Sequence, residues 1–192
     1  MDQRIFINYR GADSSSYGAL LYTELVRQFG ERHVFLDCES IPAGADFAAE
    51  LLSRVRSARV VLAVIGPHWL ADATGRRPID DRDDWIRREL VEAFAAGVRV
   101  VPILTDDATL PAEAELPADI AVLGRCQARP LRRREPVGDL ARIVADLIAM
   151  DPAMDPGMVT ATGQAGVVNT ITGHVSGTVV QAGTITGGVH LR

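Results

Sequence analysis

Residues 59–65, Arg-Val-Val-Leu-Ala-Val-Ile, form an apolar run bounded by an arginine on one side and by Gly66 on the other. The run is too short for a typical helix, lacks the polar alternation of a half-buried strand, and is rich in β-branched residues. It therefore predicts a strand that is buried on both faces. Strands of this kind occur in parallel sheets, whose two faces are covered by helices.

The sequence on both sides of this run alternates between strand and helix patterns. Further strands are predicted at residues 4–8, 34–36, 98–104 and 126–131, the last as an edge strand. Helices are predicted at residues 17–29, 47–55, 85–96 and 137–150, with a short helix between 105 and 124. Such alternation predicts the α/β class, here a flavodoxin-like parallel sheet of about five strands with helices on both faces.

Composition and charge narrow the function classes. The chain has 192 residues, of which 47 % are hydrophobic and 23 % charged, which suits one globular domain with an appendage. The net charge of -5 argues against a surface for nucleic acid or anionic membrane. Two distant cysteines and four scattered histidines indicate neither a disulfide framework nor a metal site. With no apolar signal region and no segment of about 20 apolar residues, we expect a cytoplasmic protein without a membrane span.

Residues 83–94 predict a helix whose first turns carry the candidate catalytic group. Asp83 and Asp84 both offer a carboxylate to cap its N-terminus, where the helix dipole favours acids. Trp85 and Glu89 are four residues apart, so they share a helix face that is offset from the apolar stripe. Taken alone, a glutamate on an exposed helix face is usually only solvated, so its neighbours must support the assignment.

The carboxyl ends of the predicted strands supply those neighbours. Ligands of open parallel sheets bind beyond these ends, and the helix of Trp85 starts from the same edge because it follows the loop after the central strand. The residues predicted to meet there are Asn8, Tyr9, Arg10, Asp37, Gly44, Trp69, Trp85 and Glu89. This convergence makes Glu89 the candidate catalytic residue.

Other doubly wound proteins are excluded by missing motifs. The sequence has no G-x-G-x-x-G after a strand, and it has no P-loop and no lysine to serve in one. Where a response-regulator receiver needs its acidic residues, the chain has Asn8, Tyr9 and Arg10 after the first strand and Ile65 and Gly66 at the end of the third. No Ser/His/Asp triad is suggested.

Four sequence blocks, in this order, resemble the Toll/interleukin receptor (TIR) domain over about residues 3–150. They are RIFINYR at 4–10, VFLD at 34–37 leading into IPAGADF at 41–47, VLAVIGPHWL at 61–70, and WIRREL at 85–90. The first block has Asn8 where the family usually has serine. The spacing of the blocks matches the family's order of elements, so the resemblance implies the TIR fold for this region.

The resemblance also implies an activity. Many bacterial TIR domains are NAD glycohydrolases, which cleave the bond between nicotinamide and ribose, and their essential acid occupies the position of Glu89. NAD+ would be the substrate, and no cofactor is implied. Nicotinamide leaves as a neutral molecule while positive charge develops on the ribose, so a carboxylate beside the ribose would stabilise the transition state. The product could be linear or cyclic ADP-ribose.

The substrate-binding roles of the tryptophans and of Arg10 each have an alternative. Trp85 or Trp69 could supply a stacking face for the substrate, but Trp69 could equally be a core or loop-packing residue. Arg10, together with Ser14, Ser15 and Ser16 at a helix start, could bind phosphate. The alternative for Arg10 is an ion pair with Asp37 or Asp13.

The C-terminal sequence differs from the rest of the chain. Residues 151–162 are a predicted linker, and residues 163–192 form a Gly/Val/Thr-rich, β-prone tail. The tail repeats Thr-Ile-Thr-Gly at 170–173 and 184–187, and from residue 156 onward the only charged residue is Arg192. Uncharged segments of high strand propensity without proline tend to stack between chains as cross-β structure. A flexible tail or a capping hairpin is the alternative.

The segment Val179, Val180, Gln181, Ala182 and Gly183 resembles the core of the receptor-interacting-kinase homotypic interaction motif (RHIM). The whole tail resembles the RHIM-like class of bacterial amyloid signalling motifs. That resemblance implies self-association and a partner, namely a nucleotide-binding oligomerising receptor with a matching motif.

Three hypotheses follow. In the first, the chain is a bacterial immune effector that hydrolyses NAD+ when assembly through the tail and the TIR domain switches it on. In the second, it is a non-catalytic adaptor that recruits other TIR proteins, and Glu89 is ordinary helix surface. In the third, the tail is a plain oligomerising strand pair without templating.

Overall fold

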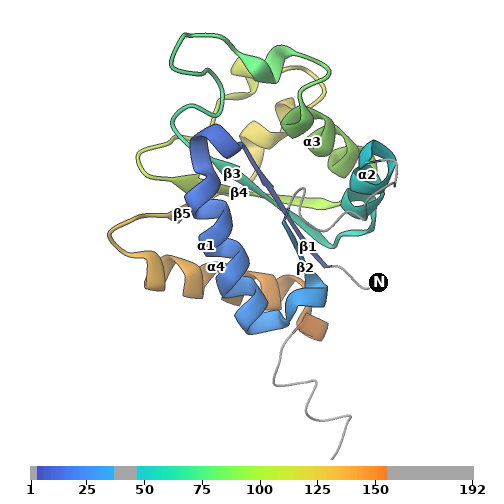
Figure 1. Cartoon of the computed structure of the whole chain (residues 1–192), viewed down its shortest axis with the longest axis vertical. Coiled ribbons are helices and arrows are strands. Elements are labelled where there is room, and N and C mark those ends of the chain that lie inside the picture. The colour runs from blue at the N-terminus through green and yellow to red at the C-terminus, as the bar shows by residue number, and fades with distance from the viewer. Residues whose placement is uncertain (1–3, 37–46, 155–192) are drawn as a thin grey trace, which may run out of the picture.

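A parallel sheet is the centre of the computed structural model, which describes residues 4–36 and 47–154. Within these residues the sheet has five strands in the order β2-β1-β3-β4-β5 (Figure 1). The strands are β1 (Ile5–Tyr9), β2 (Val34–Leu36), β3 (Val60–Ile65), β4 (Arg99–Thr105) and β5 (Arg129–Leu131). This is the order of the flavodoxin-like fold, which confirms the predicted class.

Two layers of helices cover the sheet. The helices are α1 (Gly11–Phe29), α2 (Phe47–Ser57), α3 (Trp85–Ala95) and α4 (Pro136–Met150). Apolar residues of α1 and α4 pack on one face of the sheet, and those of α2 and α3 pack on the other. Figure 1 shows the positions of these helices around the strands. The central strand β3 is buried along its whole length, as its sequence predicts.

Strand β1 shows how the sequence assigns side chains to the two layers. Ile5 and Ile7 belong to the core under α1 and α4, whereas Phe6 belongs to the core under α2 and α3. Successive side chains of a strand point to opposite faces, so Asn8 faces the same layer as Phe6. The alternation therefore brings one polar side chain of β1 under α3.

Some elements differ from the sequence prediction. Helix α1 begins at Gly11 instead of residue 17, and it is kinked at Ser14, whose φ and ψ are -137° and 23°. The segment between β4 and β5 contains two 3₁₀ turns, Glu113–Glu115 and Ala121–Arg125, instead of one short helix. Prolines at 111 and 117 explain this, because proline prevents a continuous helix.

The first residues of the predicted linker pack onto the domain. Asp151 forms an ion pair with Arg4 at 2.9 Å, and Met154 is buried against the core under α1 and α4. The rest of the linker and the tail from 163 to 192 lie outside the described residues, as do Asp37 and Gly44. The domain boundaries therefore remain predictions.

Candidate functional site

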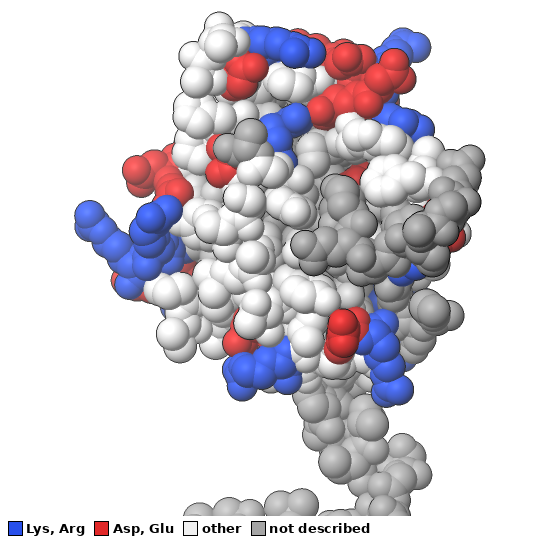
Figure 2. Space-filling model, viewed as in Figure 1, with Lys and Arg blue, Asp and Glu red and all other residues white. Residues whose placement is uncertain are grey.

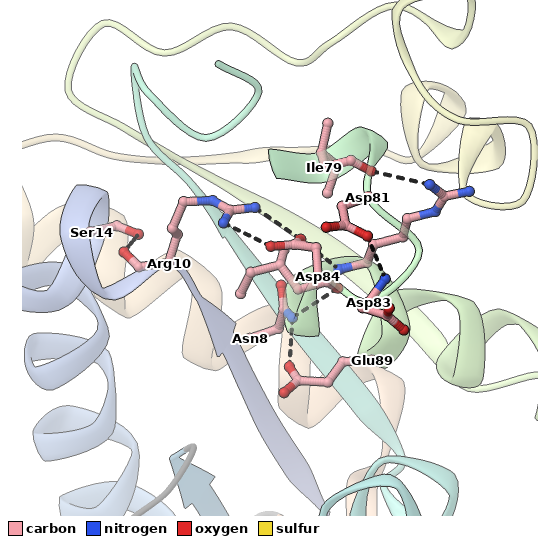
Figure 3. A network of polar contacts seen from close by, with 10 residues as sticks. Asn8, Arg10, Ser14, Ile79, Asp81, Asp83, Asp84 and Glu89 are labelled. Carbon is pink, nitrogen blue, oxygen red and sulfur yellow. Dashed lines mark hydrogen bonds and ion pairs between the residues drawn. The ribbon is translucent and has the colours of Figure 1, made fainter. Parts of the chain in front are cut away.

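A buried carboxylate and a buried amide meet between β1 and α3. Glu89 and Asn8 both have a relative exposure of 0 %. Asn8 Nδ2 donates a hydrogen bond of 2.6 Å to Glu89 Oε2 and a longer one of 3.4 Å to the backbone oxygen of Ile86 (Figure 3). Glu89 is thus an interior residue, contrary to the exposed helix surface that the adaptor hypothesis assumes. Burying a carboxylate is costly, and a hydrogen-bond donor offsets part of that cost.

The N-terminus of α3 is fixed by Asp84. Its side chain accepts a hydrogen bond of 3.2 Å from the backbone NH of Arg87, which makes Asp84 the N-cap. The same carboxylate receives two hydrogen bonds from Arg10, at 2.9 and 3.0 Å. Such a two-pronged pair is stronger and more directional than a single contact. It ties the end of β1 to the start of α3.

Replacing Asp84 with alanine should lower the free energy of unfolding by about 1–2 kcal/mol, because it removes a helix cap and the partner of a partly buried guanidinium. Asp83→Ala is the matched control. Asp83 is exposed and is not the cap, so its loss should change stability by less than about 0.5 kcal/mol. Urea unfolding followed by circular dichroism measures both. Equal losses in the two variants would contradict the assignment of the cap.

Arg10 forms an ion pair with Asp84, which is not among the partners expected from the sequence; Asp37, one of the two expected partners, lies outside the described residues. Among the described residues its carboxylate partner is Asp84, and Asp13 instead accepts a hydrogen bond of 2.9 Å from the backbone NH of His68. The proposed phosphate site at Ser14, Ser15 and Ser16 gains little support. The hydroxyl of Ser14 donates to the backbone oxygen of Arg10, and no side chain caps α1.

Arg87 is a structural residue of the site that sequence reasoning missed. Although it is charged, it is buried, and its guanidinium donates to Asp119 at 2.8 Å and to the backbone oxygen of Asp80 at 2.7 Å. It thereby holds the loop before α3 against the helix. An arginine in a helix normally predicts solvent exposure, so nothing in the local sequence marked this role.

A cavity of about 380 Å³ opens at this edge of the sheet. Three predicted binding residues, Tyr9, Arg10 and Trp85, line it, and Glu89 is not part of its wall. Further lining residues are Arg76, Pro78, Asp81, Asp83, Asp84 and Ile86. Figure 2 shows acidic and basic side chains next to one another at this end of the molecule. The lining thus carries three aspartates and two arginines, and because Asp84 is paired with Arg10, the carboxylates of Asp81 and Asp83 are the groups left to meet a cationic ligand.

Buried polar atoms without hydrogen-bond partners gather at the same edge. Within residues 4–36 and 47–154 they include Asn8 Oδ1, Arg10 Nε, Asp13 Oδ2 and Trp69 Nε1. Native proteins leave few such atoms unpaired, and those that remain often mark ligand or water sites. These four belong to the end of β1, the start of α1 and the loop after β3, which is the point where a flavodoxin-like sheet binds its ligands.

The two tryptophans have different surroundings. Trp69 has a relative exposure of 0 % and packs in the core under α2 and α3, so the structure places it as a packing residue, away from the cavity wall. Trp85 is partly exposed at the cavity. Its ring meets Phe47 edge-on with centroids 5.4 Å apart, and the guanidinium carbon of Arg88 lies 4.2 Å from its centroid.

The described part of the chain has neither a cluster of metal-binding side chains nor a helix suited to crossing a membrane. No group of three or more His, Cys, Asp or Glu side chains there could hold a metal ion. No helix there has the length and apolar character that crossing a membrane requires.

Comparison with known proteins places these features in a family. A family model described as TIR domain matches residues 5–141. The chain is similar to the NAD(+) hydrolase sarm1 of Drosophila melanogaster, with 33 % identity over 119 residues, covering 60 % of this chain and 8 % of that protein. It is also similar to the NAD(+) hydrolase tir-1 of Caenorhabditis elegans, with 27 % identity over 120 residues, covering 62 % of this chain and 12 % of that protein. The chain therefore matches only a small part of each of these relatives.

A solved structure agrees with the fold. The TIR domains of the activated Roq1 resistosome, which directly recognises the pathogen effector XopQ, superpose with a TM-score of 0.57 at 14 % identity. The match covers 76 % of this chain and 99 % of the other. Because the family model matches more than half of the sequence and the strand order agrees, the chain belongs to the TIR domain family.

Proposed function

We propose that this chain hydrolyses NAD+ at the bond between nicotinamide and ribose, with Glu89 as the catalytic carboxylate. The observation that carries the proposal is the buried pair of Glu89 and Asn8 at the carboxyl edge of β1, next to a cavity lined by aspartate and arginine side chains. Two relatives that match this region are named NAD(+) hydrolases, which supports the same substrate.

The chemistry needs one carboxylate. Nicotinamide is bound to ribose as a pyridinium cation and leaves neutral, so its departure requires no acid. Positive charge then develops on the ribose, as in glycoside cleavage, and a carboxylate held in a low-dielectric site stabilises it strongly. Water completes the hydrolysis, and attack by the adenine ring in its place would give a cyclic product.

The cavity suggests how the substrate lies. The cationic nicotinamide ring suits the carboxylates of Asp81 and Asp83, and Trp85 supplies an aromatic ring at the cavity wall. Because Glu89 has no exposed surface in this conformation, substrate binding must separate the side chains that cover it. Asp37 and Gly44, which lie outside the described residues, remain proposed substrate contacts.

Assembly is the second half of the proposal. Self-association through the TIR domain and the tail, with Val179, Val180, Gln181, Ala182 and Gly183 at its core, would raise the local concentration of TIR domains. High effective concentration alone drives such association without new contacts. The proposed partner is a nucleotide-binding oligomerising receptor with a like motif, in bacterial immune signalling.

The test is a time course of NAD+ with purified full-length protein, with and without preformed fibres of residues 163–192 as seed. We expect NAD+ loss with release of an equal amount of nicotinamide, and chromatography of the second product separates linear from cyclic ADP-ribose. NAD+ loss only in the presence of seed would support activation by assembly through the tail. NAD+ loss without seed would support the hydrolase activity but contradict its activation by the tail. No loss in either case, with fibres confirmed by dye binding, would favour the adaptor.

A further inference from the structure

Asn8 is held rigidly beside Glu89. It lies on the interior strand β1, where its backbone is paired with Ala63 of β3, and its side chain is wholly buried. Its Nδ2 contacts two hydrogen-bond acceptors, Glu89 Oε2 at 2.6 Å and the backbone oxygen of Ile86 at 3.4 Å. This fixes the orientation of the amide, because the opposite orientation would place oxygen against oxygen.

The donor that Asn8 offers to Glu89 is a neutral amide, and this matters for the chemistry. An arginine or lysine in place of Asn8 would neutralise the carboxylate and cancel the field that stabilises a ribosyl cation. An amide NH favours the ionised carboxylate without adding positive charge. Two arginines at or on these elements have carboxylate partners of their own, since Arg10 pairs with Asp84 and Arg87 pairs with Asp119.

We propose that Asn8 is the positioning residue of the site: its amide orients the Glu89 carboxylate and favours the ionised form without adding a positive charge. The inference rests on the proposed NAD+ hydrolysis and goes beyond it, because it assigns a role to a residue that need not touch the substrate.

Other charged groups on the elements around Glu89 must be considered before pH is used as a readout. They are Arg10 after β1, Asp13 at the start of α1, Asp84, Arg87, Arg88 and Glu92 at or on α3, and Glu50, Arg54 and Arg56 on α2. None of the variants below changes any of them, so a difference in pH profile between variants reports on the pair of residues 8 and 89.

Two isosteric variants of the full-length chain test the inference under the conditions that give the wild type its activity. Asn8→Leu removes the donor. We expect kcat at pH 7 to fall about 10- to 100-fold with KM within about threefold, and the acid limb of the pH profile to move to higher pH. Asn8→Asp places two carboxyl groups together, so one must hold a proton. Its profile should show an added ionisation that the wild type lacks.

Thr105→Val is the matched control. Thr105 is also wholly buried at the carboxyl edge of the sheet, and its hydroxyl donates to the backbone oxygen of Ile65 at 3.3 Å. Its replacement removes a buried hydrogen bond at nearly constant volume. A purely structural effect of losing such a bond should therefore appear in this variant as lower stability with an unchanged pH profile.

A second measurement does not depend on activity. Titration of carbon-13-labelled glutamate side chains by NMR, with the Glu89 signal assigned by its absence in Glu89→Gln, should give a higher pKa for Glu89 in Asn8→Leu than in the wild type. An active wild type whose pH profile and Glu89 titration are unchanged by both Asn8 variants would overturn the positioning role alone. A wild type that consumes no NAD+, while its Glu89 titration still responds to Asn8→Leu, would overturn the proposed hydrolysis instead.

Discussion

Glutamine in place of Glu89 should reduce nicotinamide release by roughly 10³-fold or more while the chain stays folded. The side chain keeps its size and can still accept the hydrogen bond from Asn8 Nδ2, but it has no charge to oppose the positive charge on the ribose. The melting temperature should be unchanged or higher, because the variant no longer buries a carboxylate. Initial rates of nicotinamide release and a thermal melt measure the two effects.

Glu92→Gln is the control for this experiment. Glu92 lies on the same helix and pairs with Arg56 at 2.9 Å near the surface. Because exposed ion pairs contribute little, we expect activity within about twofold and stability within about 1 kcal/mol of the wild type. Retained activity in Glu89→Gln would end the catalytic assignment. Equal loss in both variants would show that the helix, and not the carboxylate, is responsible.

Truncation of Trp69 to alanine should be the most destabilising of the substitutions considered. The side chain is wholly buried among apolar residues of the core under α2 and α3, so its removal leaves a large cavity. The expected loss is about 3–5 kcal/mol in the free energy of unfolding. Guanidinium or urea unfolding measures it, and Trp69→Phe should cost less because more of the volume is kept.

Trp85→Ala separates packing from substrate contact. Trp85 is partly exposed at the cavity, so its loss should cost less stability than the loss of Trp69. Where it stacks on the substrate, its loss should raise KM for NAD+. A Trp69→Ala chain as stable as the wild type would contradict the core assignment, and a KM effect confined to Trp69 variants would return that residue to the binding site.

The sheet could be predicted from the sequence because its strands are short apolar runs that alternate along the chain with helical patterns. The run at 59–65 became β3, and its burial on both faces correctly implied a parallel sheet. The start of α1 could not be predicted, because the chain enters the helix through a kink at Ser14 instead of a capped first turn. Two adjacent aspartates offered a cap for α3, and only the fold shows that Asp84 is used.

The environment of the candidate site was less predictable. Glu89 was predicted on a face offset from the apolar stripe, but the residue that accommodates it in the interior, Asn8, is 81 positions away in the sequence. The partner of Arg10 is likewise 74 positions away. Helical periodicity describes neighbours within one element, so it cannot report contacts that form only when β1 and α3 pack together.

The alternation of side chains along β1 limits the insertions and deletions that this strand can accept. Asn8 and Tyr9 are consecutive, and they lie in different layers, with Tyr9 in the core under α1 and α4. Inserting or deleting one residue within Ile5–Tyr9 would exchange the layers, placing an aromatic ring against Glu89 and an amide among aliphatic side chains. A shift of two residues would keep each side chain in its layer but would change the register of β1 against β3. A variant in which the length of β1 changes should therefore lose the arrangement of Asn8 and Glu89. The exposed loop before α3 can vary in length without this effect.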